Sequence, residues 1–142
     1  MRKIEKIIVH CSAGSQKNTA ADIVAYHTRP VSRGGRGWKT PGYHYIIEAD
    51  GRIVGTVPEE KISNGCKGHN ATAINVCYIG GVDVTRKGLP PVDNRTEAQK
   101  KALLSLLKHL RAKYPQAKIY GHRDFAPKAC PSFDARKEYA DL

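Results

Sequence analysis

Two short runs of apolar residues constrain the fold of this chain more than any other feature. Residues 3–11 are rich in isoleucine and valine, and residues 74–79 read Ile-Asn-Val-Cys-Tyr-Ile. Runs of this length that carry β-branched and aromatic residues are typical of buried strands, whereas a helix needs a longer segment. We therefore predict a strand over each run, with the second strand in the middle of a sheet.

Two helices are expected between and after these strands. Thr19 and Asp22 have the spacing of a capping box and predict a helix that ends before Pro30. A second capping box begins at Thr96, and the helix that follows carries leucines on one face and extends to about Tyr114. Strands that alternate with helices indicate an α/β arrangement.

The remaining segments complete this fold. Residues 43–48 and 52–57 flank an Asp-Gly pair, which predicts a hairpin because glycine accepts the positive φ of a tight turn. Residues 118–120 predict a short strand, and Asp134 can cap a final helical turn. The sequence thus predicts an α/β fold, with residues 1–142 forming a single domain around a central mixed β-sheet flanked by helices.

The charge of the chain narrows the possible partners. A formal net charge of +11 favours polyanions, and both nucleic acid and an anionic cell wall are polyanions. The sequence has no zinc-finger or helix-turn-helix spacing, and its aromatic residues are not interleaved with basic ones. These features disfavour a nucleic-acid partner. No run approaches the roughly 20 consecutive apolar residues that a membrane span requires. We therefore expect no membrane span.

Three residues that can bind a metal lie where predicted strands end. His10 is near the end of the first strand, His122 follows the last strand, and Cys130 lies eight positions further on. Strand ends meet at one edge of a sheet, so these side chains can converge. Two imidazoles and a thiolate suit zinc and leave a fourth position for water. Taken singly, however, each histidine has other roles that are more common.

We predict no catalytic role for the other three cysteines. Cys11 and Cys77 adjoin or lie within the apolar runs and are expected to be small core residues, while Cys66 has no assigned role. A cysteine-nucleophile hydrolase that used Cys11 with His10 is an alternative. Neighbours on a strand point to opposite faces, which disfavours such a pair.

Two loops offer candidate substrate contacts. Residues 31–42 are rich in glycine and arginine and contain Trp38, and aromatic side chains on loops often carry recognition. His69 lies in a second polar loop. We predict a substrate contact from each.

Three segments in order resemble one known family. They are residues 8–13 (Ile-Val-His-Cys-Ser-Ala), residues 42–47 (Gly-Tyr-His-Tyr-Ile-Ile) and residues 122–134 (His-Arg-Asp-Phe-Ala-Pro-Lys-Ala-Cys-Pro-Ser-Phe-Asp). Together they resemble the phage-lysozyme type of N-acetylmuramoyl-L-alanine amidase, whose superfamily includes the peptidoglycan-recognition proteins. The resemblance extends over nearly the whole chain.

This resemblance implies a function and roles for individual residues. His10, His122 and Cys130 match the positions of the zinc ligands, with one Zn²⁺ per chain, while Tyr43 matches a catalytic tyrosine and Lys128 a lysine that assists it. The implied reaction cleaves the amide bond between N-acetylmuramic acid and L-alanine in peptidoglycan. A non-catalytic module that binds peptidoglycan fragments is the main alternative, and a basic nucleic-acid-binding protein is a weaker one.

The expected location follows from the same resemblance. The N-terminal residues lack the long apolar stretch of a signal peptide, so we expect synthesis in the cytoplasm of a bacterium or phage-infected cell. A monomer is expected as well. It would reach the cell wall as lysis enzymes do, as an endolysin.

Overall fold

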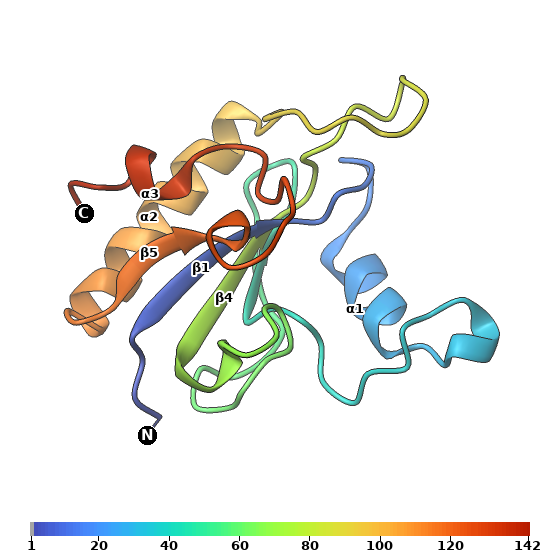
Figure 1. The fold of residues 1–142 in the computed structure, drawn as a ribbon. Coiled ribbons are helices and arrows are strands. Elements are labelled where there is room, and N and C mark those ends of the chain that lie inside the picture. The colour runs from blue at the N-terminus through green and yellow to red at the C-terminus, as the bar shows by residue number, and fades with distance from the viewer. Residues whose placement is uncertain (1) are drawn as a thin grey trace.

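The computed structural model describes residues 2–142 and contains a five-stranded sheet in the order β3-β2-β4-β1-β5 (Figure 1). The strands are β1 (Lys6–Cys11), β2 (Tyr45–Ile47), β3 (Ile53–Gly55), β4 (Ala73–Tyr78) and β5 (Lys118–Gly121). β1 runs parallel to β4 and β5, β2 runs parallel to β4, and β3 is antiparallel to β2. The predicted mixed sheet is confirmed.

The two apolar runs form the neighbouring strands β1 and β4 in the interior of the sheet. In their parallel register Ile7 lies opposite Ile74, and Val9 lies opposite Val76. All four side chains are fully buried. Parallel strands read as continuous apolar runs because both of their faces are covered, which explains why these segments lack alternation.

Helices cover both faces of the sheet. The helices are α1 (Ala20–Thr28), α2 (Glu97–Lys113) and α3 (Ala135–Glu138), and short 3₁₀ turns span Val31–Arg33, Asn70–Thr72 and His122–Asp124. α2 packs its leucines, together with α3, against the face that carries Val9 and Val76. α1 packs Ile23 against Ile46 and Cys77 on the opposite face, and Figure 1 shows α1 well apart from α2 and α3.

The predicted helix starts are confirmed by their hydrogen bonds. The hydroxyl of Thr19 accepts the N–H of Asp22 at 3.2 Å, and the hydroxyl of Thr96 accepts the N–H of Gln99 at 3.0 Å. Asp134 caps α3 through the N–H of Lys137. Each of these side chains satisfies one of the free N–H groups of a helix N-terminus. Among residues 2–142, no helix combines the length and apolarity needed to cross a bilayer.

The hairpin is confirmed, but its strands are shorter than predicted. Gly51 has a φ of 90° in the turn, as the Asp-Gly pair predicted. Both Thr56 and Val57 donate their N–H groups to the carbonyl oxygen of His44. Two residues, Thr56 and Val57, therefore lie opposite the single residue His44, so the regular antiparallel pairing ends in a bulge after Gly55.

A buried arginine joins α3 to the loop that precedes α2. The guanidinium of Arg95 donates to Glu138 Oε2 at 2.8 Å and to Asp93 Oδ2 at 2.9 Å. Its Cζ atom lies 3.5 Å from the centroid of the Phe133 ring. These hydrogen bonds lower the pKa of Asp93 and of Glu138, since the charged carboxylates are the forms that pair with Arg95.

Arg95→Met should lower the free energy of unfolding by roughly 1–3 kcal/mol at pH 7 and make it less dependent on pH. Asp93 and Glu138 have lowered pKa values in the folded protein. Their contribution to the free energy of unfolding is therefore complete above their pKa values in the unfolded chain, about 4, and is lost as the pH falls through their pKa values in the folded protein. Urea denaturation between about pH 2 and 6 measures this slope. Arg52→Met, in an exposed ion pair, is the control and should retain it. An unchanged slope in Arg95→Met would contradict the assignment.

Candidate metal centre and active site

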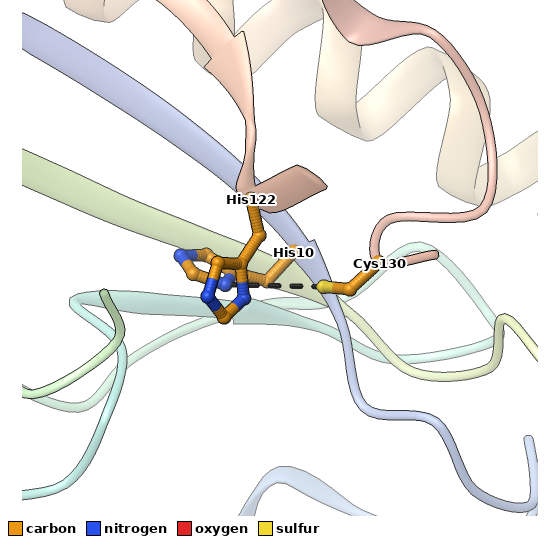
Figure 2. A group of neighbouring side chains, drawn as sticks. All are labelled: His10, His122 and Cys130. Atoms are coloured by element: carbon orange, nitrogen blue, oxygen red, sulfur yellow. Dashed lines mark hydrogen bonds between the residues drawn. The ribbon is translucent and has the colours of Figure 1, made fainter. Parts of the chain in front are cut away.

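The three predicted metal ligands come together at the edge of the sheet where the parallel strands end. His10 lies on β1, His122 directly follows β5, and Cys130 lies on the loop before α3. One ligand atom of each residue lies within 4.8 Å of those of the other two. Figure 2 shows the two imidazole rings side by side with the Cys130 sulfur facing them. Two nitrogens and one sulfur at this spacing are a donor set that can hold zinc.

The loop that carries Cys130 is fixed by three hydrogen bonds, one to the turn after β5 and two to the end of β4 and the glycine pair that follows it. The carbonyl of Cys130 accepts the N–H of Arg123 at 2.7 Å, and the hydroxyl of Tyr78 donates to the carbonyl of Pro131 at 2.6 Å. Ser132 donates its hydroxyl to the carbonyl of Gly81 at 2.7 Å. The thiol therefore reaches the two histidines although it lies 120 residues from His10 in the sequence.

His10 is buried and its ring has defined neighbours on both sides. Nε2 lies 2.8 Å from Asn75 Oδ1, while Nδ1 faces Cys130 Sγ at 4.0 Å. Burial, with a smaller effect from His122, lowers the pKa of His10 to about 3. Burial also lowers the pKa of His122, and the charge of Lys128 adds to this effect. Both rings are thus neutral at pH 7, which is the state that binds a metal.

Cys130 would be a thiol in the absence of a cation. The neighbouring Cys11 thiol and burial raise the pKa of Cys130 above its ordinary value. The N–H of Cys11 points at Cys130 Sγ from 3.2 Å and can stabilise negative charge on the sulfur. A metal cation in contact would favour the thiolate, because a coordinated thiol loses its proton.

All four cysteines are free. The Cys11 side chain packs in the core cluster with α2, whereas the His10 ring lies on the opposite face of β1. This arrangement agrees with the rejection of a Cys11–His10 nucleophilic pair. Cys77 is fully buried, so the prediction that Cys11 and Cys77 are core residues is confirmed.

A cavity of about 210 Å³ opens beside the three ligands. Tyr43, Lys128 and Trp38 all line it, together with His122 and Cys130. The centroid of the Tyr43 ring lies 5.0 Å from that of His10. Burial raises the pKa of the Tyr43 phenol well above its usual value, so the hydroxyl keeps its proton. A phenol that keeps its proton can donate a hydrogen bond.

Tyr43 and His44 point in different directions, as expected for neighbours on an extended segment. The His44 ring is completely buried, and its Nδ1 accepts the backbone N–H of Asn75 on β4 at 3.0 Å. Its Nε2 lies 2.8 Å from the carbonyl oxygen of Lys61. His44 thus fastens the loop that follows the hairpin to β4.

His69 does not lie among the side chains that line the cavity. Its ring stacks on Phe125, with ring centroids 4.2 Å apart. The structure therefore brings Trp38, Tyr43 and Lys128 to the cavity and places His69 beside a different aromatic residue.

Sequence reasoning missed two polar residues of the site. His27 on α1 forms one wall of the cavity: its Nδ1 accepts the N–H of Gly42 at 3.0 Å, and its ring centroid lies 4.8 Å from that of Trp38. Asn75 is fully buried on β4 against His10. The available signal for Asn75 was a single amide within an apolar run, since a buried amide needs polar partners.

Comparison with known proteins identifies the family. Residues 1–133 match the family described as N-acetylmuramoyl-L-alanine amidase, and the chain belongs to it. The resemblance seen in the sequence is thereby confirmed, and membership supports amidase activity on peptidoglycan.

Individual relatives agree with this family. The endolysin of Klebsiella phage KP32 is 38% identical over 136 residues, which cover 96% of this chain and 85% of that protein. The solved endolysin of the Thermus scotoductus bacteriophage Ph2119 is 28% identical, with a TM-score of 0.75 over 92% of this chain and 79% of that one. Drosophila PGRP-LB, at 22% identity, shares the fold with a TM-score of 0.73 over 100% of this chain and 82% of its own.

Removing the thiol should abolish tight zinc binding. We expect Cys130→Ser to weaken zinc binding by more than the roughly 10–100-fold typical of losing a hydrogen-bond partner of a ligand, because a ligand itself is lost. The measurement is a competition titration with a chromogenic chelator. Cys66→Ala is the matched control, since that buried thiol packs with Ile8 and Ala73 and is not among the three residues whose ligand atoms converge. Equal zinc affinity in Cys130→Ser and the native protein would remove Cys130 from the site.

Proposed function

We propose that this protein is a zinc-dependent N-acetylmuramoyl-L-alanine amidase that cleaves the bond between N-acetylmuramic acid and L-alanine in peptidoglycan. One observation carries the proposal: His10, His122 and Cys130 bring their ligand atoms within 4.8 Å of one another beside the cavity. Family membership supports the reaction, and the donor set supports the metal.

The residues fit a catalytic rather than a purely structural metal. Three protein ligands leave one position open for water or substrate, whereas structural zinc sites are closed by four. When bound, zinc supplies Lewis acidity that activates water and polarises a carbonyl oxygen. His122 and Cys130 both face the cavity, so a substrate there can reach the metal position.

Lys128 is proposed to stabilise the charge that develops on the substrate. When water adds to the lactyl carbonyl carbon, negative charge develops on the carbonyl oxygen. Lys128 lines the cavity and is close enough to His122 to help lower the pKa of that ring. Its ammonium group can therefore approach the oxygen that becomes negative.

Tyr43 is proposed to assist proton transfer. The C–N bond breaks as the L-alanine amine leaves with a proton, and a neutral hydroxyl next to the reacting atoms can donate it. Burial keeps the Tyr43 phenol protonated, and its ring lies beside His10. The hydroxyl can also donate a hydrogen bond to the negative oxygen.

Trp38 is proposed to contact the substrate across the cavity from the metal ligands. Its ring packs on His27, and the guanidinium of Arg36 lies 4.8 Å from the Trp38 ring centroid. A rigid aromatic wall of this kind suits the apolar faces of sugar or peptide groups. A contact from His69 is retained as a proposal for a substrate that extends beyond the cavity.

The biological setting is proposed from the relatives. We assign residues 1–142 to one amidase domain, because Tyr139 and Leu142 beyond the matched range pack on the same core. All three proposed metal ligands belong to one chain, so the site needs no partner subunit, and a monomer is proposed. The endolysin names of the relatives support synthesis in a bacterial or phage-infected cytoplasm and action on the cell wall.

Digestion of purified sacculi tests the function. The protein should release free stem peptides with a new N-terminal L-alanine, a chelator should abolish release, and added zinc should restore it. Binding to sacculi without release would instead support a non-catalytic peptidoglycan-binding module. Salt-dependent DNA binding without hydrolysis would favour the nucleic-acid alternative that the positive charge suggested.

Tyr43→Phe and Lys128→Met should each lower kcat by about 10²–10³-fold, the usual cost of losing one stabilising donor. Zinc content should not change, because neither side chain belongs to the proposed ligand set. Tyr114→Phe and Lys118→Met, whose side chains lie outside the cavity lining, are matched controls. Full kcat in Tyr43→Phe or in Lys128→Met would remove that residue from the mechanism.

A further inference from the structure

A buried chain of polar side chains extends from the loop before β4 to the His10 ring. Asn75 is fully buried, His10 is 1% exposed and Ser63 is 2% exposed. Asn70 begins the chain at the 3₁₀ turn that precedes β4. Polar groups buried away from water must pair each donor with an acceptor, so the orientation of each side chain restricts the orientation of the next one.

Two backbone N–H groups fix the orientation of Asn70. The N–H of Gly65 lies 3.1 Å, and that of Cys66 2.8 Å, from Asn70 Oδ1. A backbone N–H can only donate, so the atom that receives both must be the carbonyl oxygen of the amide. The Asn70 side chain therefore presents an acceptor and not an NH₂ group.

Asn70 in turn fixes Asn75. Asn75 Nδ2 lies 3.1 Å from Asn70 Oδ1 and 2.8 Å from Ser63 Oγ. If the Asn75 amide were turned over, two carbonyl oxygens would face each other at that distance. Its NH₂ group must therefore point toward Asn70, and its Oδ1 atom must point toward His10.

Asn75 then decides which nitrogen of His10 carries the proton. Oδ1 of Asn75 lies 2.8 Å from His10 Nε2 and can only accept, so Nε2 must be protonated. A neutral imidazole has one N–H, which leaves Nδ1 with a free lone pair. Nδ1 is the atom that faces Cys130 Sγ, as the dashed line in Figure 2 marks.

We propose that Asn70 and Asn75 are positioning residues that hold His10 in its Nε2-protonated form and so keep Nδ1 free for the metal. The proposal rests on the zinc site proposed above. In the other tautomer a proton would occupy the place where the metal must bind. The backbone of residues 65 and 66 thus acts on the metal centre through two asparagine side chains.

The surroundings of Asn75 support this role. The Ser63 oxygen accepts from Asn75 Nδ2, and the Ser63 hydroxyl proton faces His44 Nδ1 at 3.1 Å, a lone pair that it shares with the backbone N–H of Asn75. Gly65 allows this close packing, because a Cβ atom at that position would lie 2.7 Å from Asn75 Cγ. No side chain larger than hydrogen fits against the amide without moving it.

The tautomer of His10 in the metal-free native protein is the first test. Nitrogen-15 NMR of histidine-labelled protein at neutral pH distinguishes a protonated nitrogen from one with a free lone pair. We expect Nε2 of His10 to be protonated and Nδ1 to be unprotonated. A protonated Nδ1 would overturn the proposal, whatever the variants do.

Variants at Asn70 and Asn75 test the relay itself. Asn75→Leu and Asn70→Ala should shift the His10 tautomer toward protonated Nδ1 and weaken zinc binding by about 10–100-fold, as for other lost partners of metal ligands. Asn70→Asp is the matched control, because a carboxylate still accepts from both backbone N–H groups and from Asn75. It should retain the native tautomer and zinc affinity.

The outcomes separate this proposal from the proposed enzyme function. If folded Asn75→Leu and Asn70→Ala keep the native tautomer and zinc affinity, the positioning role is wrong. If either variant fails to fold, the tautomer of His10 in the native protein and in Asn70→Asp still tests the positioning role. If the protein shows the expected tautomer and binds zinc but releases no peptide from sacculi, the positioning role stands and the amidase proposal is wrong.

Discussion

The parallel pairing of β1 with β4 and β5 is the constraint on which the rest of the structure depends. It brings the carboxyl ends of these strands to one edge, where His10 and His122 meet although 112 positions separate them in the numbering. It also requires cover on both faces of the sheet, which α2 and α3 supply on one side and α1 on the other. The sheet therefore positions His10 directly, and it positions His122 through the 3₁₀ turn that begins at the end of β5.

The third ligand depends on a different kind of support. Cys130 lies on a loop, and loops hold a geometry only when other groups fix them. Here the Tyr78 hydroxyl, Ser132 and the packing of Phe133 under Arg95 attach that loop to the sheet and to the segment before α2. The metal centre thus combines two strand-end histidines with one thiol whose position comes from long-range hydrogen bonds and packing.

The shared fold does not by itself decide between cutting and binding peptidoglycan. One architecture can carry more than one function, so a likeness of fold alone assigns neither activity to this chain. The local chemistry favours an enzyme: the neutral imidazole of His122, a thiol that a cation would ionise and a protonated phenol line one cavity, and the buried ring of His10 lies beside them. These groups are poor partners for each other without a metal, and they suit one that is open to substrate.

The sequence by itself determined the element types, because capping boxes, the Asp-Gly turn and the apolar runs act over a few residues. It also singled out His10, His122 and Cys130 as metal-binding residue types near strand ends, and the family resemblance added Tyr43 and Lys128. Only the tertiary structure decided that Asn75 bonds His10, that His27 forms a cavity wall and that His69 packs on Phe125. Those contacts join residues far apart in the chain, so no local pattern of a single sequence records them.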